Sequence, residues 1–136
     1  MSKLSWSLRA LGALALFAIA ADHLYEYYVD GYSSIPTIGT LFLLNGIGGI
    51  ALGLALLVAK NRPAGVAAVA GIGLATASLI ALFVSESTPL FGFMEFGYRT
   101  VIVVAIVAEV SAIVLLGAFL AGSSAWRSRA SLPQSS

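Results

Sequence analysis

Long apolar runs alternate with short polar segments along this chain. Each of the four runs is close to the roughly 20 residues that an α-helix needs to cross about 30 Å of hydrocarbon. Each connecting segment contains a proline, which suits the start of a new helix: Pro36, Pro63 or Pro89. The pattern predicts four transmembrane helices, at about residues 8–28, 37–59, 64–84 and 98–121.

Composition supports a membrane-embedded chain. Of 136 residues, 60% are hydrophobic and 10% are charged, whereas a soluble domain carries about 25% charged residues. The mean hydropathy of +0.99 agrees. We therefore predict an all-α membrane protein: one four-helix bundle over residues 1–122, followed by a polar, Ser-rich cytoplasmic tail over residues 123–136.

Basic residues predict the orientation of the bundle, because Lys and Arg are enriched on the cytoplasmic side. Only Arg99 falls on the other side in an alternating topology. The other bases flank the first helix, join the second to the third, or follow the fourth: Lys3, Arg9, Lys60, Arg62, Arg127 and Arg129. Both termini are thus predicted to be cytoplasmic. Trp6 and Trp126 fall at the inner boundary and all tyrosines at the outer one, which agrees.

A cleaved signal peptide is the main alternative to four helices. Lys3 and Arg9 form a basic start, an apolar run follows, and Ala18-Ile19-Ala20 resembles a cleavage site. Other classes are disfavoured by composition. A net charge of +1 gives no field to attract nucleic acid, and the absence of cysteine removes disulfides and thiol chemistry.

Glu109 is the most informative single residue, because it lies near the middle of the predicted fourth helix. A charged side chain there costs about 2.5–3.5 kcal/mol on insertion scales, so a lone carboxyl favours its neutral form. Ala105 and Ala112 share its face and allow another helix to approach. Glu109 is either a proton-carrying or ligand-binding acid, or a neutral side chain hydrogen-bonded across a helix interface.

Further polar candidates fall in the outer half of the predicted bundle. Asp22, His23 and Glu26 are spaced to share one face of the first helix. Helical rise places His23 roughly 7 Å outward of the bilayer centre, so contact with Glu109 is conceivable. The second helix adds Asn45, and Glu95 can pair with Arg99 if the fourth helix begins early. With Thr76 and Ser78 on the third helix, these residues predict an outward-facing polar pocket above an inner half that is almost purely apolar.

Several occupants of that pocket are compatible with the sequence, and the cofactor is unknown. A single metal ion at His23, Glu26 and Glu109, a haem with one axial histidine, and a quinone or lipid head group are alternatives to a purely internal polar network. A hydrolase is disfavoured, because His23 alone would have to serve Ser78 or Ser111.

Small residues predict close helix packing. Gly49 and Gly53 form a GxxxG pattern in the second helix, and Gly71 is flanked by alanines at the same spacing in the third. We expect these two helices to pack together, with self-association of the chain as the alternative. The outer loop 90–97 is too apolar for a solvated loop, and so predicts an interfacial anchor or a lid over the bundle mouth.

The motifs Gly31 to Gly39, Leu41 to Asn45, His23-Leu24 and Leu90 to Glu95 resemble those of small four-helix membrane proteins of actinobacteria. The likeness covers roughly residues 10–120; it implies a bacterial inner membrane and no activity. The leading interpretation is a non-catalytic accessory subunit that binds lipid or a partner within a homo-oligomer or larger membrane complex. The alternative is a small transporter or redox-related protein that binds a proton, ion, quinone or metal.

Overall fold

The computed structural model describes residues 1–130, which form four long α-helices and one short 3-10 helix. They are α1 (Lys3–Tyr28), η1 (Tyr32–Ser34), α2 (Ile38–Val58), α3 (Asn61–Ser87) and α4 (Thr100–Ala130). Each α-helix is long and apolar enough to span a membrane, α4 over its segment Thr100–Ser123. The predicted fold class, an all-α protein with four candidate transmembrane helices, is confirmed.

Three of the predicted helix ends move outward, because helical hydrogen bonding continues beyond an apolar run. α1 begins at Lys3, since the Ser2 hydroxyl accepts a hydrogen bond from the Ser5 N–H at 3.0 Å and caps the helix. α3 begins at Asn61 and carries Pro63 in its first turn, where proline's missing N–H has no helical partner to lose.

α4 continues to Ala130, beyond the predicted end near Ala121. At Ser123 the hydroxyl donates to the Phe119 carbonyl at 2.9 Å, so this polar residue is accommodated within the helix. The side chains of residues 124–130, and the rest of the predicted tail at 131–136, lie outside the described residues.

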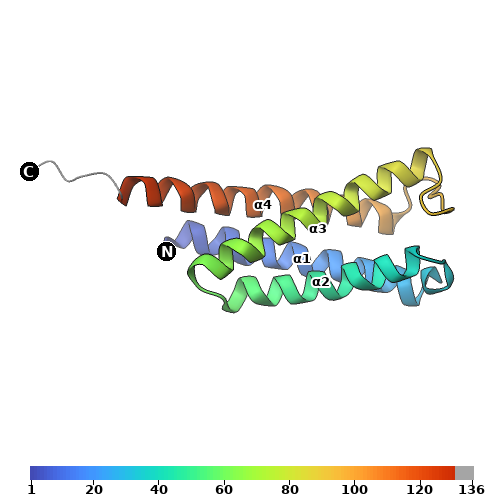
Figure 1. The fold of residues 1–136 in the computed structure, drawn as a ribbon, viewed down its shortest axis with the longest axis horizontal. Coiled ribbons are helices and arrows are strands. Elements are labelled where there is room, and N and C mark those ends of the chain that lie inside the picture. Colours follow the sequence, from blue (N-terminus) through green and yellow to red (C-terminus); the bar gives the residue numbers. More distant parts are fainter. Residues whose placement is uncertain (131–136) are drawn as a thin grey trace, which may run out of the picture.

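The helices form a four-membered ring in which consecutive helices run in opposite directions (Figure 1). α1 and α3 each pack against α2 and α4, and they face each other across the diagonal. The centre is filled by leucine, isoleucine and alanine, with Leu16, Ile19, Leu56 and Leu116 fully buried. The segment that resembles a signal peptide therefore supplies part of the core.

Glycines bring α2 close to α1, not to α3 as the sequence suggested. A Cβ on Gly49 would lie 2.9 Å from the Leu16 carbonyl oxygen and 3.0 Å from the Ala20 Cβ. One on Gly53 would lie 2.4 Å from the Phe17 ring. Gly71 of α3 faces side chains of α1 and α4. Small residues predict close approach, but they do not predict which neighbour approaches.

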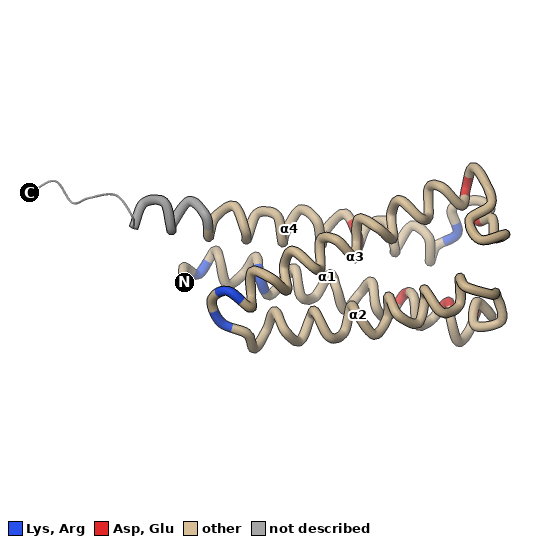
Figure 2. The backbone as a smooth tube through the Cα atoms, viewed as in Figure 1, with Lys and Arg blue, Asp and Glu red and all other residues tan. Residues whose placement is uncertain are grey.

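Charged residues divide between the two ends of the bundle (Figure 2). Lys3, Arg9, Lys60 and Arg62 lie toward the end that holds the N-terminus and the α2–α3 connection, whereas Arg99 lies beside α4's first turn at the opposite end. This distribution keeps the prediction that the first end is cytoplasmic.

Arg9 corrects two predictions, because it does not precede the first helix and the inner half is not purely apolar. It lies within α1 and is 3% exposed. Its guanidinium donates hydrogen bonds to the carbonyl oxygens of Leu56 and Ala59 at the end of α2, and it lies over the Trp6 ring. Arg9 thus satisfies carbonyls that the end of α2 leaves without helical partners, where a cation is electrostatically favoured.

The predicted orientation can be tested with single cysteines, because the chain contains none. We expect Ser33→Cys, exposed in η1, to react with a membrane-impermeant maleimide on intact cells. A cysteine appended after Ser136 is the matched control and should react only after permeabilisation. The reverse pattern, or labelling of both sites on intact cells, would contradict the orientation.

Candidate functional site

A cavity of about 370 Å³ lies within the half of the bundle that contains Arg99. All four helices and the segment between α3 and α4 line it, mostly with apolar side chains such as Ile38, Leu74 and Ala81. Its polar lining residues are His23, Glu26, Asn45, Ser78, Ser85, Glu95 and Glu109. This volume falls within the range of small-molecule sites in proteins.

The tertiary structure brings the predicted site residues together around this cavity. Five of the seven candidates line it: His23, Glu26, Asn45, Glu95 and Glu109. The other two, Asp22 and Arg99, contact the lining residue Glu26. The Asp22 carboxyl lies within hydrogen-bonding reach of the Glu26 carboxyl, and the Arg99 Nη2 lies 3.6 Å from Glu26 Oε2.

His23, Ser78 and Glu109 form an inner polar cluster from three helices. The His23 Nδ1 lies 2.9 Å from the Ile19 carbonyl oxygen; a carbonyl only accepts, so Nδ1 carries a proton. On the other side of the ring, Nε2 lies 3.1 Å from Ser78 Oγ and 4.0 Å from Glu109 Oε1. Neutral His23 therefore accepts from the Ser78 hydroxyl, while protonated His23 can pair with ionised Glu109.

This cluster lacks features needed for hydrolysis. Ser78 lies in the middle of α3, where helical bonds occupy the backbone N–H groups, so no such donor is free beside it to stabilise an oxyanion. In addition, a carbonyl orients the His23 ring, and Glu109 faces the same nitrogen as Ser78. The contact between Ser78 and His23 is better suited to holding or passing a proton.

Metal binding is not supported by the geometry. Across the part of the chain that the structure describes, no three histidine, aspartate or glutamate side chains gather closely enough to hold an ion. The candidates His23, Glu26 and Glu109 share one cavity wall without forming such a set. Around the cavity, their oxygens are instead available for hydrogen bonding.

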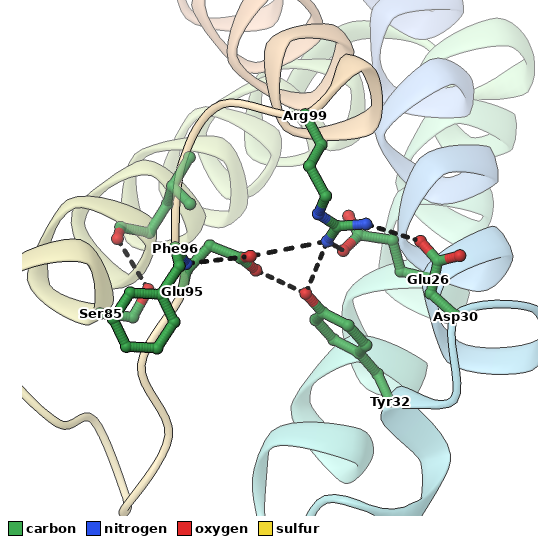
Figure 3. A network of polar contacts seen from close by, with 8 residues as sticks. Glu26, Asp30, Tyr32, Ser85, Glu95, Phe96 and Arg99 are labelled. Carbon is green, nitrogen blue, oxygen red and sulfur yellow. Dashed lines mark hydrogen bonds and ion pairs between the residues drawn. The ribbon is translucent and has the colours of Figure 1, made fainter.

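An outer polar network closes the end of the cavity, and Arg99 is its centre (Figure 3). Nη1 donates to Asp30 Oδ2 at 3.2 Å, and Nη2 donates to the Tyr32 hydroxyl oxygen at 2.9 Å. Glu95 Oε1 and Glu26 Oε2 lie 3.5 and 3.6 Å from Nη2. The predicted pair of Glu95 and Arg99 therefore forms, although α4 begins only at Thr100.

Tyr32 is a site residue that sequence reasoning missed as an individual. Its hydroxyl donates to Glu95 Oε2 at 2.5 Å, and its ring packs against Phe42 and Phe93. Burial and the hydrogen bond to Glu95 raise the pKa of this hydroxyl, which keeps it protonated. Gly39 permits the arrangement, because a Cβ there would lie 2.5 Å from the Tyr32 carbonyl oxygen.

The apolar loop folds back over the bundle mouth. Leu90 and Phe93 exchange backbone hydrogen bonds across a tight turn, and the Glu95 N–H donates to the Ser85 carbonyl at 3.0 Å. Leu90, Phe93 and Glu95 line the cavity, whereas Phe91 and Phe96 are 63% and 75% exposed. One side of the loop thus covers the cavity, and the other presents phenylalanines that suit an interfacial anchor.

Four buried oxygen atoms beside the cavity have no hydrogen-bond partner among the described residues: Asp22 Oδ2, Glu26 Oε2, Asn45 Oδ1 and Glu109 Oε2. The Glu26 and Glu109 residues are each 1% exposed. Buried polar atoms are normally paired, so unpaired acceptors that line a cavity mark a binding site.

Fold and site together define an α-helical protein with four candidate membrane spans and an internal, acidic cavity. No protein-family model, curated protein or solved structure matches the chain. The likeness to actinobacterial four-helix proteins therefore stays a prediction.

Proposed function

We propose that this protein is a membrane-embedded, non-catalytic binding protein whose cavity takes a small amphiphilic molecule. The observation that carries the proposal is the cavity itself, which combines apolar walls with unpaired buried oxygens of Glu26, Asn45 and Glu109. A purely structural polar network would satisfy these atoms internally, because an unpaired buried acceptor costs about 1–3 kcal/mol.

The cavity reaches the lipid-facing surface between α2 and α3. Leu41 and Leu44 of α2 line it, yet they are 43% and 58% exposed. These helices diverge toward the α3–α4 connection (Figure 1), and Leu74 and Ala77 line the facing wall. An apolar opening at membrane depth suits a molecule dissolved in the bilayer. We place the protein in a bacterial inner membrane on the strength of the family resemblance.

Transport is a second candidate function, and the outer network favours it. Arg99 contacts Glu26 in the cavity wall and also holds Tyr32, Asp30 and Glu95 over the outer mouth. A ligand that engages Glu26 competes with Arg99 for that carboxyl. Binding would then loosen the cover and allow release to the outer side.

A substitution that fills the cavity tests the binding function. Ala81 lines the cavity on α3, whereas Ala70 of the same helix is exposed and does not. We expect native mass spectrometry of wild-type protein in mild detergent to show a stoichiometric small-molecule mass. Ala81→Trp should remove this mass, and the matched control Ala70→Trp should keep it.

Three results would contradict the proposal. Wild-type protein without bound mass would argue against an endogenous ligand, and equal loss in both variants would show that the bound molecule lies elsewhere. Co-purification of another subunit, without any small molecule, would instead support the accessory role.

A further inference from the structure

We infer that the ligand is an amphiphilic amine, bound as its ammonium form, which enters from the bilayer between α2 and α3. This inference rests on the proposed binding function and specifies the chemistry of the bound molecule. Hydrogen-bonding complementarity, charge and the shape of the cavity support it separately.

Every unpaired polar atom in the cavity wall is an acceptor. Glu26 Oε2, Asn45 Oδ1 and Glu109 Oε2 each lack a partner. The nearby donors are already engaged: the Tyr32 hydroxyl bonds Glu95, and the His23 Nδ1 proton bonds the Ile19 carbonyl. A complementary ligand must therefore bring donors, and an ammonium group carries three of them.

The charge balance points to the same group. The carboxyl groups in and beside the cavity are Asp22, Glu26, Asp30, Glu95 and Glu109, and the positive groups near them are Arg99 and, when protonated, His23. Arg99 is shared among three of these acids. Glu109 has only His23 as a cationic neighbour, at 4.0 Å. A cation in the cavity would balance this excess of acid.

The same argument disfavours other occupants. A quinone presents carbonyl oxygens, and a phosphate or carboxylate head group presents anionic oxygens; both need donors that the cavity does not offer. Neutral alcohols supply one donor and no charge. The amine is the class that meets both requirements, because charge-assisted hydrogen bonds are about twice as strong as neutral ones.

The route into the site follows from where the cavity is closed. Tyr32, Phe93 and the Arg99 network cover its outer end. By contrast, the side between Leu44 and Ala77 is apolar and reaches the lipid-facing surface. An alkylamine can lie along Ile38, Leu41 and Leu74 with its nitrogen toward Glu109 or Glu26.

Three probes of equal chain length test this inference: radiolabelled decylammonium, decanol and decanoate. Equilibrium binding is measured with full-length protein in phosphatidylcholine nanodiscs, and empty nanodiscs supply the background. We expect saturable binding of one decylammonium per protein, at least about 10-fold weaker binding of decanol, and none of decanoate. Ala81→Trp should abolish the saturable decylammonium signal, and Ala70→Trp should retain it.

The outcomes separate this inference from the proposed function. Equal affinity for decanol, or tighter binding of decanoate, overturns the amine assignment and leaves a binding cavity. The absence of saturable decylammonium binding also overturns the assignment, and the native mass measurement then decides the binding function. Saturable binding that survives Ala81→Trp places the probe outside the cavity and counts against both.

Discussion

Glu109→Gln is expected to lower the affinity for decylammonium by about 10- to 100-fold while the protein stays folded. Hydrogen bonds to charged groups contribute roughly 1.5–3 kcal/mol, which corresponds to that range at about 1.4 kcal/mol per tenfold. Glutamine keeps the shape and one acceptor oxygen of this 1% exposed side chain, but it removes the negative charge. Binding in nanodiscs and thermal unfolding of the same samples supply the two readouts.

Glu86→Gln is the matched control for this experiment. Glu86 belongs to α3 and does not line the cavity, so the same chemical change there should leave affinity unaltered. If Glu109→Gln binds decylammonium as tightly as wild type does, Glu109 is a structural hydrogen-bonding residue. If both variants weaken binding equally, the effect comes from overall charge and not from the site.

Gly49→Ala is expected to destabilise the bundle by about 1–3 kcal/mol, the usual cost of an added methyl group in a tightly packed interface. The new Cβ would lie 2.9 Å from the Leu16 carbonyl oxygen. That oxygen belongs to the backbone of α1, so it cannot move away by a change of rotamer. The thermal unfolding midpoint in detergent and the monodisperse fraction on size exclusion should both fall.

Gly73→Ala provides the comparison, because nothing lies within 4 Å of a Cβ built on Gly73. Alanine is favoured over glycine within a helix by roughly 0.5–1 kcal/mol, so this variant should be as stable as wild type or slightly more stable. A stable Gly49→Ala protein would show that α1 and α2 pack less closely than the structure describes.

The helices were predictable because hydrophobic runs report directly on exposure to lipid. Their ends were less so, since the Ser2 cap and the continuation of α4 through Ser123 depend on hydrogen bonds that hydropathy does not measure. Arg9 was misplaced for a related reason. Its charge suggested solvent, but the carbonyls at the end of α2 offer it partners inside the bundle.

The candidate site was predictable in its members and not in its connections. A carboxyl at Glu109 and the spacing of His23 and Glu26 are expensive in hydrocarbon, so they stand out without any structure. Which atoms meet depends on the rotation and relative height of separate helices. Ser78 contacts His23, and Tyr32 links Glu95 to Arg99, only because α3, η1 and the 88–99 segment are placed by packing.

By itself, the sequence determined that this protein has four apolar helices, with its bases gathered at one end and its acids in the other half. Those properties follow from the free energy of placing each side chain in lipid or water, which depends mainly on local sequence. The tertiary structure alone decided that Gly49 faces α1, and that Glu26, Asn45 and Glu109 line one cavity that opens between α2 and α3. These features depend on contacts between distant segments, and close packing of side chains selects one arrangement among many with the same hydropathy.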